Sequence, residues 1–252
     1  MLAVAAGVFL CAALVLLRKP WTAENFLPRG VMSLIVFYVG LILTAWAQHA
    51  AGPLPARASV AQMVIAMLSL QGATLVLVTL LLKEYGSSWR EAFGLAHDLR
   101  RAVLIGLIVG CLFLPIGMAL KFGSEKTIEH FTKSRPAQQE AVETIQVTSS
   151  PFHRVLLGIV TIILAPLGEE TLFRGVLYST IKQAGFPKAA FWLSSLGFAA
   201  IHMNVAAFIP LMVLAMFLAM TYEKTDNLLA PITAHAAFNA IEFVAIFLQG
   251  GG

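Results

Sequence analysis

The chain contains few charged residues and little cysteine. Only 12% of its 252 residues are charged, and its two cysteines, Cys11 and Cys111, lie far apart in apolar stretches. Two such residues are expected to act as small apolar side chains rather than as a disulfide framework. Because 59% of the residues are hydrophobic and the mean hydropathy is +0.83, a soluble globular domain is excluded. The composition indicates a polytopic membrane protein.

The sequence also lacks the short motifs of several common hydrolases. It contains no G-x-S-x-G, no H-E-x-x-H and no cysteine close to a histidine motif. The net charge of +4 comes from loops, so it indicates membrane topology and a lipid bilayer as partner rather than nucleic-acid binding. Arg18 and Lys19 follow the first apolar run instead of preceding it, so we interpret this run as a membrane helix and not as a cleaved signal peptide.

Apolar stretches of roughly spanning length predict an all-α polytopic membrane helix bundle with about eight membrane-embedded helices. No linker divides the chain, so residues 1–252 are predicted to form a single transmembrane domain. The sixth stretch is short for a membrane span. The expected helices are 2–17, 30–48, 59–82, 102–121, 153–174 (continuing to about 183), 188–203, 205–222 and 229–249.

The distribution of lysine and arginine predicts the orientation of this bundle. The loops after the first, third, fifth and seventh helices hold ten of these residues, and the connections on the other side hold six. Positively charged loops stay in the cytoplasm, so both termini are expected outside it. The expected location is a bacterial cell (inner) membrane, because the chain is compact and carries no organelle signal.

Two stretches are predicted not to span the membrane. Residues 88–101 begin with a capping-box pattern, Ser88 and Glu91, and have an apolar side, which predicts an interfacial helix with a structural role. Residues 122–152 are polar, with Pro136 in the middle. We interpret them as a solvated connector in preference to a lid over a site.

Three ionisable residues follow the apolar run of residues 155–167: Glu169, Glu170 and Arg174. A charged side chain at the centre of a membrane helix costs about 2.5–3.5 kcal/mol on insertion scales, so a functional site is the default interpretation. Positions four apart share a helix face, which predicts a Glu170–Arg174 pair. Glu169 lies about 100° around the helix from Glu170 and is expected to face a cavity instead.

Two later apolar segments carry further polar side chains at a spacing of four. Phe198 precedes His202, and His235 precedes Asn239, so each pair shares one helix face. A carboxylate beside a histidine in a partly dry site can take a proton from water. A second histidine and a carboxamide can donate hydrogen bonds to a developing oxyanion. Together these side chains predict hydrolysis by activated water.

Helix spacing predicts that Glu169 and His202 lie at the same depth. They are equidistant from the turn at residues 184–187, and each is expected about 25 Å from the tip of that helical hairpin. Pro166 lacks the amide that would bond to the carbonyl of Ile162, which predicts a kink one turn before Glu169.

The three patterns are E-E-x-x-x-R, F-x-x-x-H and H-x-x-x-N. In this order they resemble the CAAX protease and bacteriocin-processing family of intramembrane glutamate proteases, to which the eukaryotic Ras-converting CAAX endoprotease belongs. The resemblance covers roughly residues 150–245. It implies that Glu169 is the water-activating base, that His202 is its partner, and that His235 and Asn239 form the oxyanion site.

The remaining motif residues take supporting roles under this resemblance. Glu170 and Arg174 complete the first motif as a structural pair, and Phe198 is expected to pack against the site. No cofactor and no metal are predicted. The substrate is expected to be a peptide or a membrane-protein segment, which the sequence does not specify further. The other four histidines fall in loops or at segment ends and are expected to be solvated: His49, His97, His130 and His153.

Two alternatives remain open. A zinc-dependent membrane protease would use Glu169, His202 and His235 as ligands, a His₂Glu set. A non-enzymatic immunity, scaffold or transport protein would use the polar cluster to bind an ion or a partner. Transporters commonly show internal repeats, and the sequence has none.

Overall fold

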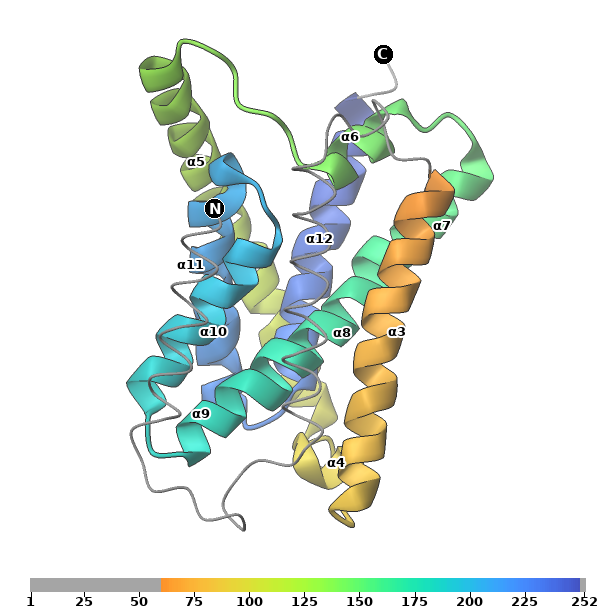
Figure 1. The fold of residues 1–252 in the computed structure, drawn as a ribbon, viewed down its shortest axis with the longest axis vertical. Coiled ribbons are helices and arrows are strands. Elements are labelled where there is room, and N and C mark those ends of the chain that lie inside the picture. Colours follow the sequence, from red (N-terminus) through yellow and green to blue (C-terminus); the bar gives the residue numbers. More distant parts are fainter. Residues whose placement is uncertain (1–59, 250–252) are drawn as a thin grey trace, which may run out of the picture.

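The computed structural model describes residues 60–249, which form a bundle of helices without a strand in that range (Figure 1). Two π-helical segments, η1 and η2, interrupt the long helical path of residues 151–183. The predicted helices 2–17 and 30–48 lie outside the described residues. The elements are α3 (Val60–Glu84), α4 (Trp89–Ala92), α5 (Leu99–Thr132), α6 (Glu140–Val147), α7 (Pro151–Ile159), η1 (Val160–Leu164), α8 (Ala165–Glu170), η2 (Thr171–Tyr178), α9 (Ser179–Gln183), α10 (Pro187–Ile201), α11 (Val205–Thr225) and α12 (Leu229–Gln249).

Four stretches of helix are long and apolar enough to cross a membrane, and a shorter apolar stretch covers Leu70–Lys83. The predicted class of an all-α integral membrane protein is therefore confirmed, whereas the count of eight helices stays a prediction. The helix α10 has 15 residues and is shorter than these spans, as the sequence predicts. The four candidate spans are Leu99–Thr132, Pro151–Gln183, Val205–Thr225 and Leu229–Leu248.

The helices α5 and α12 pack closely through small residues. A Cβ added at Gly106 would lie 2.5 Å from the carbonyl oxygen of Ala230, and one at Gly110 would lie 2.5 Å from that of Ala234. The two backbones therefore touch, which is how small residues at a spacing of four associate membrane helices. Large apolar side chains elsewhere on α5 are exposed and suit contact with lipid: Leu104, Leu107, Ile108, Leu112 and Met118.

Substituting the glycines of α5 tests this packing. We expect Gly110→Ala to destabilise the protein, by about 1–3 kcal/mol, because the added methyl meets the α12 backbone. Gly123→Ala is the matched control, since nothing lies within 4 Å of a Cβ there and alanine favours helix by about 1 kcal/mol. Thermal unfolding in detergent measures both variants. If both variants changed the unfolding temperature equally and in the same direction, the close contact of α5 with α12 would be contradicted.

The predicted interfacial helix over residues 88–101 is wrong in extent. Its capping box is present, with Ser88 and Glu91 bonded to each other in both directions, and this hydrogen bonding lowers the pKa of Glu91. The helix nevertheless ends at Ala92. Gly94 has φ +67° and its Cα lies so close to the Asp226 carbonyl that a side chain would not fit. The backbone turns there, and Asp98 starts a new helix.

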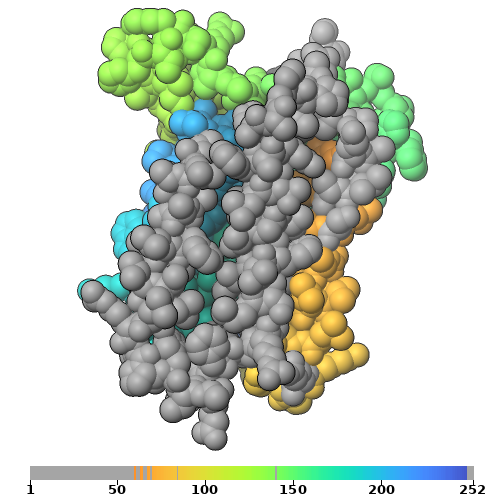
Figure 2. Space-filling model, in the orientation of Figure 1, coloured from red at the N-terminus to blue at the C-terminus, as the bar shows by residue number. Residues whose placement is uncertain are grey.

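The interpretation of residues 122–152 as a solvated connector is also wrong in part. The helix α5 continues to Thr132 and projects with the following segment at the top left of the molecule (Figures 1 and 2). The helix α6 packs against α12, and the side chains of Thr144, Ile145 and Thr148 are buried. Ile145 belongs to an apolar cluster with Leu157 and Val160, and this contact of α6 is hidden by the polar average over the stretch.

Candidate active site

Pro166, at the start of α8, leaves one backbone carbonyl of the preceding turn without a backbone hydrogen-bond donor. In the preceding π-helical turn, the amide of Ala165 bonds to the carbonyl five residues earlier. The same register would pair residue 166 with the carbonyl of Thr161, but proline has no amide hydrogen. The side-chain nitrogen of Asn239 donates to that carbonyl instead, at 2.9 Å. Because of the π-helical turn, the carbonyl without a backbone donor belongs to Thr161. Regular α-helical spacing predicts Ile162, one residue later.

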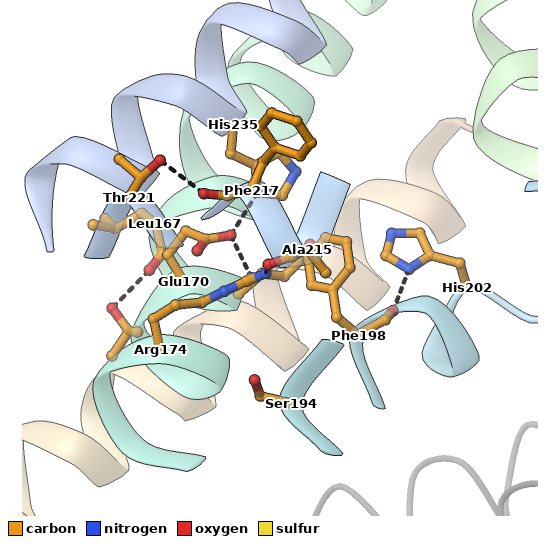
Figure 3. A network of polar contacts seen from close by, with 12 residues as sticks. Leu167, Glu170, Arg174, Ser194, Phe198, His202, Ala215, Phe217, Thr221 and His235 are labelled. Atoms are coloured by element: carbon orange, nitrogen blue, oxygen red, sulfur yellow. Dashed lines mark hydrogen bonds and ion pairs between the residues drawn. The ribbon is translucent and has the colours of Figure 1, made fainter. Parts of the chain in front are cut away.

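The short helix α8 carries both motif glutamates between the two π-helical segments. Such segments are rare and often occur at functional sites. Glu170 is fully buried, and its Oε1 is 2.9 Å from Nη1 of Arg174 and 2.9 Å from Nδ1 of His235 (Figure 3). The Nη2 of Arg174 donates to the carbonyl of Ala215 at 2.8 Å. The predicted Glu170–Arg174 pair is present, and it ties η2 to α11 and α12.

Phe198 packs at the centre of this network. Its buried ring lies 4.8 Å from the guanidinium carbon of Arg174, a distance suited to a cation–π contact. The same ring lies 5.0 Å from the ring of His202 and 5.5 Å from that of His235. An edge contact with Phe173 completes its surroundings. Phe198 thus contacts Arg174, His202 and His235, and its role in a functional site stays a prediction.

The hydrogen bonds of the two histidines determine which ring nitrogen is available for chemistry. The Nδ1 of His202 is 2.8 Å from the carbonyl of Phe198. A carbonyl only accepts, so Nδ1 carries the proton and Nε2 of the neutral ring keeps its lone pair. His235 likewise directs Nδ1 at a carboxylate. Its Nε2 can therefore donate a hydrogen bond only when the ring is doubly protonated.

A cavity of about 160 Å³ brings the four predicted catalytic residues together. Glu169 of α8, His202 at the end of α10, and His235 and Asn239 of α12 all line it. The equal depth of Glu169 and His202 stays a prediction. The cavity wall is mainly apolar, and residues 137–139 with part of α6 also contribute to it.

Gln71 is a site residue that the sequence analysis missed. It lies in α3, is 1% exposed, and donates from Nε2 to Oε1 of Glu169 at 3.4 Å. The available signal was a carboxamide in the middle of the apolar segment 59–82. Only the fold reveals that it faces Glu169, because no motif joins α3 to α8.

His97, His130 and His153 are exposed, as predicted. Cys111, which the sequence analysis interprets as a small apolar side chain, is exposed on α5. His49 and Cys11 lie outside the described residues. Within residues 60–249, no three histidine, cysteine or acidic side chains are grouped so that they could hold a metal ion. The expectations of no metal and no cofactor stay predictions.

Comparisons with known proteins cover the part of the chain that holds these motifs. Residues 151–241 match the family described as type II CAAX prenyl endopeptidase, Rce1-like. An uncharacterized protein of Bacillus subtilis, YpbD, is 36% identical over 83 residues, which are 31% of this chain and 40% of that protein. The UPF0177 protein YxdF of Lactococcus lactis is 31% identical over 96 residues, 38% of this chain and 50% of that protein.

The matching stretches thus span half or less of these two curated relatives. No solved structure matches the chain. The matched residues 151–241 contain both glutamates of α8, the two site histidines and Asn239. This segment is therefore similar to the Rce1-like family of CAAX-type endopeptidases.

Proposed function

We propose that this protein is an intramembrane endopeptidase that hydrolyses a peptide bond with water activated by Glu169 and His202. The observation that carries the proposal is the shared cavity, where Glu169, His202, His235 and Asn239 converge from three helices. The match of residues 151–241 to the type II CAAX prenyl endopeptidase family supports a protease. Glu169 is available for this role because Arg174 is bonded to the other glutamate of the motif.

The reaction follows from the proton positions of these side chains. The carboxylate of Glu169 takes one proton from water, while Nε2 of His202 accepts a hydrogen bond from the other and orients the oxygen. The oxygen attacks the carbonyl carbon of the peptide and forms a tetrahedral oxyanion. The proton held by Glu169 then passes to the leaving nitrogen. The C–N bond breaks and yields a carboxylic acid and an amine.

His235 and Asn239 serve the oxyanion in this scheme. Asn239 has two amide hydrogens, and only one is required by the carbonyl of Thr161. His235 contributes Nε2–H in its doubly protonated form, since Nδ1–H is donated to Glu170. In that form the cations of Arg174 and His235 both contact the carboxylate of Glu170.

The cavity also indicates the class of substrate. Its wall is mainly apolar and includes Met67, Leu211 and Phe238, while Lys121, Glu125 and Glu242 are its charged residues besides Glu169. An apolar peptide segment that unfolds locally within the membrane fits this lining, since its exposed backbone would be shielded from lipid. The relatives come from bacteria, which supports a bacterial cell membrane as the location.

A zinc-dependent protease is the alternative for Glu169, His202 and His235, which line one cavity but, within residues 60–249, are not grouped so that they could hold a metal ion. Chelation separates the two mechanisms. We expect cleavage of a reporter peptide to survive strong chelation, because a carboxylate and a histidine activate water without a metal. Elemental analysis should find no stoichiometric zinc. Loss of activity on removal of one tightly bound zinc, with recovery on its return, would select the metalloprotease instead.

A further inference from the structure

Gln71 makes an unusual contact for a helix in an apolar environment. Its side chain is 1% exposed, and its Nε2 lies 3.4 Å from Oε1 of Glu169. Only the amide nitrogen can donate to a carboxylate, so the chemistry of the pair sets the orientation of the carboxamide. The distance is long for such a bond. Hydrogen bonds of an active site often tighten only when the substrate is present.

The residue before Glu169 makes room for this contact. A Cβ at Gly168 would overlap the side-chain oxygen of Gln71 and lie 2.9 Å from its Cβ. The glycine therefore permits the close approach of α3 to α8 at this level. Any larger residue at position 168 would push the carboxamide away from Glu169.

The two oxygens of Glu169 have different surroundings. Oε1 accepts from Gln71, whereas Oε2 is buried and has no hydrogen-bond partner among the described residues. Glu169 lines the cavity but Gln71 does not. The carboxamide thus contacts the carboxylate without itself lining the cavity. It is placed to act on the reaction through Glu169 and not by touching the substrate.

We propose that Gln71 is the positioning residue of Glu169. This inference rests on the proposed water-activating role of Glu169. The carboxamide holds Oε1 and fixes the plane of the carboxylate, so that Oε2 is the oxygen that takes the proton from water. The site is then completed by α3, a helix outside the matched segment 151–241.

The variant Gln71→Met tests the proposal, because methionine has nearly the same length and shape but cannot donate a hydrogen bond. We expect kcat for a reporter peptide to fall roughly 10- to 100-fold, the range seen when a reacting group loses a supporting contact or its alignment. KM should change little, since Gln71 does not line the cavity. Should Gln71→Met fail to fold, Gln71→Asn withdraws the carboxamide by one methylene, and the same loss of kcat is expected.

Thr79→Val is the matched control on the same helix. It removes a hydroxyl that accepts from the indole of Trp89 at 3.1 Å, away from Glu169. We expect lower thermal stability with unchanged kcat. A wild-type kcat in a folded Gln71 variant, or an equal fall of kcat in Thr79→Val, would overturn the positioning role.

A double-variant cycle separates this inference from the function on which it rests. Adding Gln71→Met to Glu169→Gln should reduce the residual turnover no further, because Gln71 acts through Glu169. A further 10- to 100-fold loss would overturn the inference. Wild-type cleavage by Glu169→Gln alone would instead refute the proposed function. An inactive Glu169→Gln beside a fully active Gln71→Met would refute only the role of Gln71.

Discussion

Replacing Glu169 by glutamine is expected to reduce peptide cleavage by about 10²–10⁴-fold, the range for a lost general base. Glutamine keeps the size of the side chain and can still accept from Gln71, but it cannot take a proton from water. The variant should insert and fold, because a neutral amide is cheaper to bury in lipid than a carboxylate. Turnover of a reporter peptide by the purified variant, at known folded concentration, measures the effect.

His153→Gln is the matched control for this substitution. His153 is exposed, lies within the matched segment, and does not line the cavity. It should leave turnover unchanged. If Glu169→Gln supported full biological function in cells, catalysis by Glu169 would be refuted and a scaffold or immunity role would replace it.

Replacing Glu170 by glutamine is expected to act mainly on stability. The guanidinium of Arg174 is 0% exposed, and Glu170 is its carboxylate partner at 2.9 Å. Removing one partner of a buried ion pair costs about 3–5 kcal/mol, because the other charge stays buried without compensation. Thermal unfolding in detergent should therefore show a large loss of stability. Some loss of cleavage should accompany it, since Glu170 also holds the ring of His235.

The double variant Glu170→Gln with Arg174→Met identifies the cause of that loss. It removes the stranded cation together with its partner, so its stability should exceed that of Glu170→Gln alone. Equal or lower stability of the double variant would contradict the account of an uncompensated charge. Comparison with Glu169→Gln, which should be stable but inactive, distinguishes the two adjacent glutamates.

The motif region could be predicted well from the sequence because its constraints are local. Ionisable side chains are costly in lipid, so Glu169, Glu170 and Arg174 within an apolar segment indicated a functional site. The spacing of four indicated which glutamate pairs with Arg174, and hairpin symmetry indicated that His202 and Glu169 share a depth. The catalytic roles assigned to these residues stay predictions until variants are measured.

Features that depend on contacts between distant segments could not be predicted. The approach of Gln71 to Glu169 requires α3 to pack on α8, and no local pattern encodes that pairing. The two π-helical segments arise from packing along a single apolar helix, where hydrophobic periodicity does not distinguish five-residue from four-residue bonding. The burial of α6 depends on α12, more than 80 residues later, so the polar composition around it was misleading.

Mass spectrometry of cleavage products formed in ¹⁸O-labelled water tests the central claim most directly. A polypeptide captured from native membranes by Glu169→Gln is presented to the wild-type protein and to that variant, each reconstituted in lipid. We predict that the wild type cuts one peptide bond and leaves one ¹⁸O atom in the new carboxylate, while the variant leaves the polypeptide intact. Equal cleavage by both proteins, or no cleavage by the wild type, would contradict the claim that Glu169 activates water for peptide hydrolysis.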